Sequence, residues 1–382
     1  MGQIVEVPIT PSVLRWAIDQ SGYSREELAN RLGISPAELR DWEKGDSSPG
    51  LTEFRHLAGQ LHRQAAFFFL DSPPVQKDVR VQLRRPPGSK RTELNAVERR
   101  YVREIRRYQR ALEWILEELD TAKIDFPVLA ISGEPANAAR DLRSRLQIDT
   151  ARQAGWHSTS ESFRAWRSAV ESLGVFVFVL PLGGDAVRGF SVWSDRAPVV
   201  VLNSAWDVAA RIYTLFHEIG HLLTRTDSAC LAYYTGVARS KDLLLERWCE
   251  RFAAEVLIPR DDVRGLLSKR VGWKQGTKSD LAVAGKVARH YNVSLSASVL
   301  ALIGVGAADQ SLYAAIPESA DMRSGGGGGR PRNRSEISEG RFGDRTWSIF
   351  RRAIREDLMT RADAMTYLDV ADTEHHARSA RD

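Results

Sequence analysis

The chain has 382 residues, a length typical of two or three domains of about 100–200 residues each. Hydrophobic residues make up 43% of it and charged residues 27%, which is ordinary for a globular protein that buries a sizeable core. No apolar run reaches the roughly 18 residues of a membrane span, and the first residues lack the basic start and apolar core of a signal peptide. Two cysteines cannot form a disulfide framework, so we expect a cytoplasmic protein with no membrane partner.

The first predicted unit is a succession of short helices between residues 12 and 70, the first of them ending at Gly22. Ser24 and Ser35 each stand directly before a helical pattern and are placed as N-caps. Gly33 is placed for a left-handed C-cap, and the Gly-Ile-Ser turn joins two helices into a helix-turn-helix. The pattern Leu-Ala-x-x-Leu-Gly-Ile-Ser, followed by Trp-Glu-x-Gly, resembles that of the Cro/C1-type (XRE) repressor domains.

The resemblance implies that residues 35–44 form a recognition helix that enters the major groove of DNA. Its candidate DNA contacts are one hydroxyl and two basic side chains: Ser35, Arg40 and Lys44. The same helix carries three acidic side chains, which DNA phosphates would repel: Glu38, Asp41 and Glu43. Two hypotheses therefore stay open, in which this module binds DNA or instead binds protein or a second copy of itself.

The basic excess of the chain lies in one segment. Residues 1–76 carry seven Lys or Arg against ten Asp or Glu, whereas residues 77–110 carry twelve against four. A Pro-Pro-Gly sequence at residues 86–88 predicts a linker, and an amphipathic helical pattern begins after Thr92, its candidate N-cap. The arginines of this segment fit either a solvated helix face or salt-dependent contact with DNA phosphates, which would assist the helix-turn-helix.

Three runs of β-branched and aromatic residues follow at positions 175–182, 188–193 and 197–203. We expect a small sheet of about three strands packed on the next helix, an α+β arrangement. The edge of such a sheet could hold an extended peptide by strand addition.

The sharpest chemical signal is Leu-Phe-His-Glu-Ile-Gly-His-Leu-Leu at residues 215–223. His217 and His221 are four residues apart, so on a helix they lie on one face and can bind a single Zn²⁺. Glu218 lies between them, close enough to act as a base toward a water on that ion. The motif predicts metal-assisted hydrolysis with Zn²⁺ as the cofactor.

A catalytic zinc site needs a third protein ligand and an open fourth position. Glu246 and Glu250 are both candidates, because they are four residues apart on the helix predicted at residues 246–259. Cys249 is another candidate, although such a cysteine is more often a small buried hydrophobic residue. Three tyrosines are candidate donors to an oxyanion, although packing is their commoner role: Tyr213, Tyr233 and Tyr234.

The stretch from Phe163 to Pro259 resembles the ImmA/IrrE family of zinc metallopeptidases, which are of the HEXXH type. The resemblance rests on FRAWRSAVESLGVFVF, RGFSV, APVVVLNS, YTLFHEIGHLL and ERWCERFAAEVLIP. It implies that Zn²⁺ is bound by His217, His221 and Glu246 and that Glu218 is the base. This chain departs from the family pattern at Cys249, where alanine is usual, and one residue later, where Glu250 replaces asparagine.

The remaining patterns complete a multidomain prediction. Residues 279–304 predict a second helix-turn-helix-like pair with a structural role, and a Gly-rich linker leads to a helical hairpin and a polar tail. We expect an all-α helix-turn-helix domain followed by an α+β zincin-like metallopeptidase domain and a helical C-terminal region. The predicted bounds are 1–72 for the first domain, 73–125 for the basic linker and connecting helix, 126–310 for the peptidase domain and 311–382 for the rest.

Two functions follow from these patterns. The first is a zinc metallopeptidase fused to a repressor-like DNA-binding module, since members of the resembling family cleave helix-turn-helix repressors. Its protein substrate or partner would be such a repressor or a toxin. The second is a non-catalytic transcriptional regulator or antitoxin, in which the peptidase-like domain serves as a sensor or partner-binding surface. Glu218 favours the enzyme, because a binding module has no need of it.

Overall fold

The computed structural model describes residues 6–74, 82–84, 95–184, 186–225, 240–271, 274, 278–317, 320 and 334–368. The chain divides into two compact units, the first formed by Met1–Val79 and Arg91–Glu104 and the second by Arg80–Lys90 and Ile105–Asp382. The division falls within helix α5 (Ala96–Glu118), so the first turns of this helix belong to the first unit and the rest to the second.

The first unit contains α1 (Pro11–Asp19), α2 (Arg25–Leu32), α3 (Pro36–Lys44), α4 (Leu51–Gln60) and the short helix η1 (Ala65–Phe69). Ser24 and Ser35 are the N-caps of α2 and α3, and each hydroxyl accepts the backbone N–H of the residue three positions on. Gly33 ends α2 in the left-handed conformation, with φ +74°. The helix-turn-helix prediction is therefore confirmed. The unit closes around a buried apolar core that includes Leu14, Ile18, Leu28, Leu39, Trp42, Phe54 and Phe68.

Two expected helix boundaries are wrong, and hydrogen bonds of nearby side chains explain both. Helix α1 ends at Asp19 rather than at Gly22, because the Ser21 hydroxyl donates to the Ile18 carbonyl, 2.6 Å away, and turns the chain. Helix α5 begins at Ala96, and Thr92 lies outside the described residues. The cap is Asn95, which exchanges two hydrogen bonds of 2.7 and 2.8 Å with Glu98 in a capping box.

The second unit is built on a mixed sheet of β1 (Gln82–Arg84), β2 (Phe176–Leu180), β3 (Gly189–Val192) and β4 (Val199–Asn203). The order is β1-β3-β4-β2; β2 is parallel to β4, while β3 is antiparallel to β4 and β1. Every residue of β2, β3 and β4 is buried, which explains their nearly continuous apolar sequences. The three predicted strands are all present, and a short piece of the basic linker, β1, pairs with β3 as a fourth strand that the sequence did not indicate.

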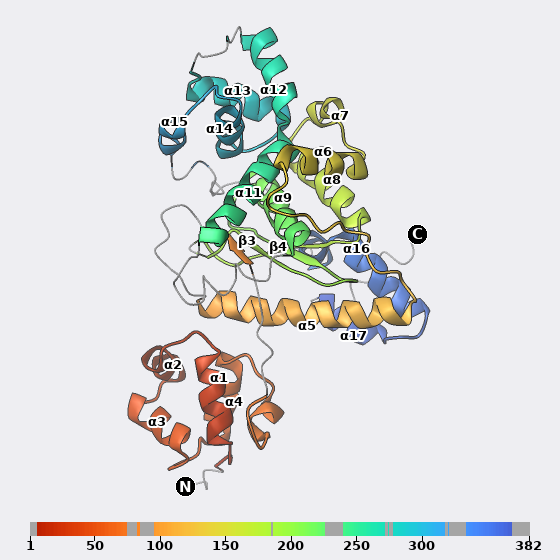
Figure 1. The fold of residues 1–382 in the computed structure, drawn as a ribbon. Helices are drawn as coiled ribbons and strands as arrows, with labels where there is room; N and C mark the ends of the chain where they lie inside the picture. The colour runs from red at the N-terminus through yellow and green to blue at the C-terminus, as the bar shows by residue number, and fades with distance from the viewer. Residues whose placement is uncertain are drawn as a thin grey trace. The chain divides into compact units, whose positions relative to one another are not determined.

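Helices surround this sheet in the second unit (Figure 1). Those before and at the site are α6 (Pro135–Leu146), α7 (Thr150–Ala154), α8 (Thr159–Ser172), α9 (Val208–Thr224) and α11 (Ser240–Leu257). Those that follow are α12 (Arg260–Leu266), the π-helical turn η2 (Leu267–Val271), α13 (Leu281–Tyr291), α14 (Leu295–Gly304) and α15 (Gln310–Ala314). The central α9 contacts β3, β4, α8 and α11, so the predicted metal motif lies in the core of the unit.

The second helix-turn-helix-like pattern forms α13 and α14, joined at Asn292, which adopts the left-handed conformation with φ +53°. Buried residues of both helices, among them Val287 and Leu302, belong to the same hydrophobic core as α9 and α11. The structural role predicted for this pair is consistent with that packing.

The C-terminal helices are α16 (Arg334–Arg355), which bends at Gly343, and α17 (Arg361–Leu368). The bend is held by the buried ion pair of Arg167 and Glu171 on α8, which is 3.0 Å long. Arg167 also donates to the Gly340 carbonyl at 2.8 Å, and Glu171 accepts the Arg345 backbone N–H at 3.2 Å. The Gly-rich linker and the polar tail lie outside the described residues. None of the helices that the structure describes is long and apolar enough to cross a membrane.

Candidate metal centre

Helix α9 places the three residues of the metal motif in the interior of the second unit. The helix begins at Asp207, whose carboxylate accepts the Ala209 backbone N–H at 2.9 Å. His221 lies one turn after His217. The side chains of both histidines, like that of Glu218, are almost completely shielded from solvent. Histidine and glutamate are rarely buried without partners, so this burial itself indicates a specific polar site.

Helix α11 supplies the third member of the group. One carboxylate oxygen of Glu246 lies 3.2 Å from His217 Nε2, and the other lies 3.4 Å from His221 Nε2. The two Nε2 atoms are 3.1 Å apart. Two imidazoles and one carboxylate from two helices thus converge, and among the described residues they form a group that is able to hold a metal ion.

The spacing of these donors suits a tetrahedral ion. Ligands at about 2.0–2.1 Å from a tetrahedral Zn²⁺ are separated from one another by about 3.3–3.4 Å. The two Nε2 atoms are 3.1 Å apart, close to that value, and they lie 3.2 and 3.4 Å from two different oxygens of Glu246. Two imidazoles and one carboxylate are also a donor set that Zn²⁺ accepts, so the residues present fit the predicted ion.

The structure separates the two glutamates that the spacing left open. The Glu246 side chain is only 20% exposed and faces both histidines, whereas Glu250 is exposed one turn further along α11. The backbone carbonyl of Glu250 accepts a hydrogen bond of 3.0 Å from the Tyr213 hydroxyl. Tyr213 therefore joins α9 to α11. The other two candidate donors, Tyr233 and Tyr234, lie outside the described residues.

The protonation states of Glu246 and His221 determine how this group binds a cation. Burial raises the pKa of Glu246, but the two imidazoles lower it by more, so the carboxylate is ionised at neutral pH. Burial lowers the pKa of His221, yet Cys249 and Glu246 raise it well above its ordinary value. A metal ion must then displace a proton from His221, and its binding strengthens as the pH rises.

Cys249 lies behind the site rather than among the ligands. Its buried Sγ is 3.6 Å from His221 Nδ1, the ring nitrogen that points away from Glu246. Second partners of this kind fix the orientation and tautomer of a metal-binding imidazole. Helices α9 and α11 approach closely at Gly220, where a Cβ would lie 3.2 Å from both Cys249 Sγ and Phe252 Cδ1.

Sequence reasoning missed Ser191, which is the buried partner of Glu218. The Ser191 hydroxyl on β3 donates to Glu218 Oε2 at 2.9 Å. Strand β3 runs close over α9, since a Cβ added at Gly189 would be 2.6 Å from Thr214 Cγ2 and 3.7 Å from Glu218 Cγ. A lone polar residue inside an apolar strand was the signal in the sequence, but only the packing of β3 on α9 identifies its partner.

In the helix-turn-helix, the acidity of the predicted recognition helix is partly neutralised. Glu43 is buried and accepts three hydrogen bonds of 2.8–3.1 Å from Arg25 on α2, so one of the three acidic side chains stabilises the unit. Arg40 and Lys44 are exposed, and Ser35 uses its hydroxyl for the helix cap. These positions leave the two basic side chains available to DNA, while the serine has a structural role of its own.

The first turns of α5 give the same unit a basic cluster. Burial, together with the nearby positive charges of Arg63, Arg99 and Arg100, lowers the pKa of Arg103 to about 10. Arg103 donates to the Gln20 carbonyl at 2.7 Å, so it fastens α5 to the end of α1. The basic segment therefore divides into arginines with structural hydrogen bonds and exposed ones such as Arg100.

Comparison with known families agrees with these two sites. Residues 14–66 match a helix-turn-helix family, and residues 170–302 match the family described as the IrrE N-terminal-like domain, a peptidase family. No curated protein matches the chain. The chain thus joins a Cro/C1-type helix-turn-helix DNA-binding domain to an IrrE N-terminal-like domain of the metallopeptidase class, with a His-His-Glu group suited to a metal ion in the latter.

Proposed function

We propose that this protein is a zinc-dependent endopeptidase that cleaves a helix-turn-helix repressor or a related regulatory partner, and that its N-terminal domain directs it to DNA. The observation that carries the proposal is the convergence of His217, His221 and Glu246 beside the fully buried Glu218. A site that only holds an ion needs no further carboxylate beside its three ligands, whereas hydrolysis needs one to move a proton.

The chain's own residues divide the chemistry among them. His217, His221 and Glu246 would hold Zn²⁺, which would supply Lewis-acid polarisation of a peptide carbonyl and acidify a water molecule. Glu218 would take a proton from the attacking water on its carboxylate and return it to the leaving amine. Ser191 holds Glu218 Oε2 by a hydrogen bond of 2.9 Å, and so fixes the carboxylate against β3. The burial of His217, His221, Glu218 and Ser191 strengthens these interactions.

Replacing Glu218 by glutamine tests this assignment. The amide keeps the size of the side chain but cannot carry the proton, so we expect cleavage to fall by at least about 100-fold while bound zinc is unchanged. Purified wild type and Glu218→Gln are incubated with proteins that contain Cro/C1-type domains, and products are identified by mass spectrometry. Metal content is measured on the same samples.

The matched control is Glu250→Gln, which makes the same chemical change at an exposed residue of α11. It should cleave as wild type does. Equal cleavage by wild type and Glu218→Gln would disprove the role of Glu218. A zinc-loaded wild type that cleaves none of these proteins, nor its own chain, would favour the non-catalytic regulator or antitoxin.

The edge of β3 is the place where we expect the substrate to bind. A peptide that pairs with β3 would run directly beside Ser191 and Glu218. That edge is occupied by β1, with Gln82 opposite Ser191, Leu83 opposite Phe190 and Arg84 opposite Gly189. The linker strand must therefore leave before a substrate can pair, which makes the linker between the two domains a regulator of access.

A double substitution in the linker strand tests this arrangement. Proline at both Gln82 and Leu83 removes two consecutive backbone N–H groups, one of which faces β3, so β1 should detach. We expect the KM for cleavage to fall several-fold with little change in kcat. The control is alanine at the same two positions, which keeps both N–H groups. A proline variant that is folded but has an unchanged or higher KM would contradict the arrangement.

A further inference from the structure

The linker strand β1 lies at the edge of the sheet where a substrate is expected to pair. It runs antiparallel to β3, with Gln82 opposite Ser191. It also contacts α9, the helix that carries the metal motif. Residues 80–90, which include β1, belong to the second unit, whereas the chain before them and directly after them belongs to the first. A segment of the chain itself therefore occupies the place beside Glu218.

The register of β1 on β3 indicates which peptide bonds lie level with Glu218. Glu218 approaches β3 at two positions: Oε2 accepts the Ser191 hydroxyl at 2.9 Å, and Cγ would lie 3.7 Å from a Cβ added at Gly189. The β1 residues opposite these two positions are the first and the last of the strand. Leu83 stands between them, so the two peptide bonds of Leu83 are level with the carboxylate.

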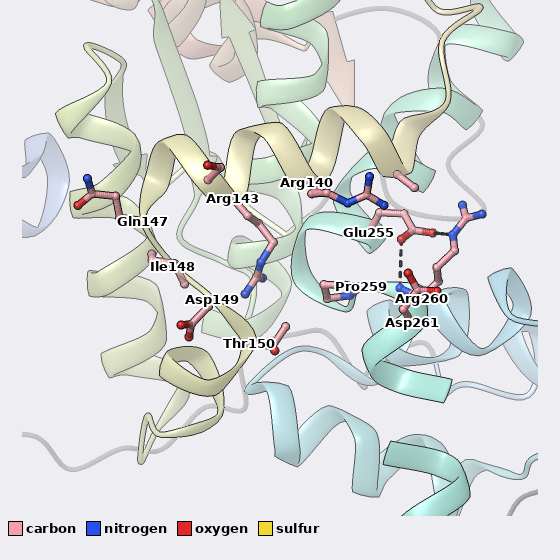
Figure 2. A pocket seen from close by; sticks show the side chains of 12 residues that line it. Arg140, Arg143, Gln147, Ile148, Asp149, Thr150, Glu255, Pro259, Arg260 and Asp261 are labelled. Carbon is pink, nitrogen blue, oxygen red and sulfur yellow. Dashed lines mark hydrogen bonds and ion pairs between the residues drawn. The ribbon is translucent and has the colours of Figure 1, made fainter. Parts of the chain in front are cut away.

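A cavity elsewhere in the same unit offers no comparable place for a peptide. It is bounded by α6, by the start of α7 and by the junction of α11 with α12, and none of its lining residues belongs to α9 or β3 (Figure 2). Its three arginines are balanced by three carboxylates, those of Asp149, Glu255 and Asp261. A peptide held there would pair with neither β3 nor the metal group, so the edge occupied by β1 is the better candidate.

We propose that this chain is its own first substrate and hydrolyses one of the two peptide bonds of Leu83. The inference rests on the proposed peptidase function, since it uses the same metal group and the same Glu218. One water is consumed: its oxygen joins the carbonyl carbon, the C–N bond breaks, and Glu218 transfers the proton of that water to the leaving nitrogen. The products are a new carboxylate and a new amino group, so no further reactant is needed.

The shortness of β1 favours cleavage over permanent inhibition. The strand has three residues, and Pro86 and Pro87 lack the backbone N–H groups that would extend its pairing. Hydrolysis at Leu83 leaves only one or two paired residues on each side of the break, fewer than a stable strand needs. The two new ends therefore leave β3. Because β1 is part of the same chain, its cleavage needs no encounter between molecules.

Cleavage at Leu83 changes both units. Met1–Val79, which precedes the break, loses its covalent bond to the rest of the first unit. It is then held by packing alone, such as the hydrogen bond of 2.7 Å from Arg103 on α5 to the Gln20 carbonyl. In the second unit, the edge of β3 becomes open to another peptide. Self-cleavage thus converts a chain whose site is blocked into a peptidase that accepts other proteins.

Addition of zinc to the metal-free full chain tests the proposal. We expect mass spectrometry to show two fragments that together have the mass of the chain plus one water, with a new end at Leu83. The rate constant should stay the same over about a 100-fold range of chain concentration, because the reaction is intramolecular. The KM for cleavage of Cro/C1-type proteins should be highest just after zinc addition and should fall several-fold as the intact chain disappears.

Variants of the linker strand and of Glu218 serve as matched controls. Alanine at both Gln82 and Leu83 keeps the backbone pairing, so this variant should cut itself as wild type does. Proline at both positions should prevent self-cleavage but not cleavage of other proteins. Glu218→Gln should keep an intact Leu83 even when it is mixed with wild type. In the metal-free proteins, amide hydrogen exchange of β3 should be faster in the proline variant than in the alanine variant, which reports the pairing without catalysis.

The outcomes separate self-cleavage from the proposed peptidase function. If zinc-loaded wild type cleaves Cro/C1-type proteins while its own chain keeps the intact mass, self-cleavage is wrong and the peptidase function stands. If it cleaves neither, both are wrong. Self-cleavage within one chain is also wrong if wild type cuts Glu218→Gln at Leu83, or if the proline variant cuts itself at the same bond.

Discussion

Substitution of Glu246 by alanine is expected to abolish metal retention, whereas the same change at Glu250 leaves it intact. Glu246 provides two carboxylate oxygens at 3.2 and 3.4 Å from the two imidazoles, so its loss removes one of three donors. Changes to residues that only support metal ligands already cost about 10–100-fold in affinity, and loss of a ligand should exceed that. Zinc per chain after dialysis, and competition with a chelator, measure the effect.

The paired variants make this result specific to the site. Glu250 is an exposed carboxylate on the same helix, one turn further along α11, and its backbone contact to Tyr213 survives the substitution. Circular dichroism before metal loading shows whether both variants are folded. If the Glu250 variant loses zinc and the Glu246 variant keeps it, the third ligand is the other glutamate. Because His221 must release a proton, occupancy of the wild type should decline as the pH falls.

Substitution of Gly343 by alanine should be among the most destabilising single changes in the second unit. Gly343 has φ +77° and ψ 168°, a conformation that costs other residues about 1–3 kcal/mol. Its missing side chain also makes room for the Arg167 and Glu171 pair. A Cβ there would overlap Glu171 Oε1 and lie 2.7 Å from Arg167 Nη2. We expect a loss of about 3 kcal/mol or more in the free energy of unfolding, measured with urea.

A glycine three residues earlier on α16 is the matched control. Gly340 is exposed, and a Cβ there would meet nothing within 4 Å. Alanine should therefore stabilise α16 by up to about 1 kcal/mol, through its higher helix propensity. The hydrogen bond from Arg167 to the Gly340 carbonyl involves only the backbone and is retained. Similar stability of the two variants would contradict the role given to the bend.

Sequence by itself was sufficient where the determining interactions are local. Ser24 and Ser35 cap their helices through hydrogen bonds within the first turn. Gly33 ends α2 because glycine readily adopts the left-handed conformation. The spacing of His217 and His221 likewise sets both imidazoles on one face of α9 before any packing is known. The same limit explains the error at Gly22, since the Ser21 hydroxyl and the helix compete for one carbonyl and composition does not decide between them.

Tertiary structure decided what depends on contacts between distant segments. Which of Glu246 and Glu250 faces the two imidazoles follows from how α9 packs on α11, where a Cβ at Gly220 would lie 3.2 Å from Cys249 Sγ. Ser191 and Glu218 are 27 residues apart in the sequence, and only the packing of β3 on α9 brings them together. The linker strand exists because β3 offers it a free edge to pair with. The spacing of residues in a helix or strand shows which side chains share one face of that element, whereas a site forms where the faces of several elements meet.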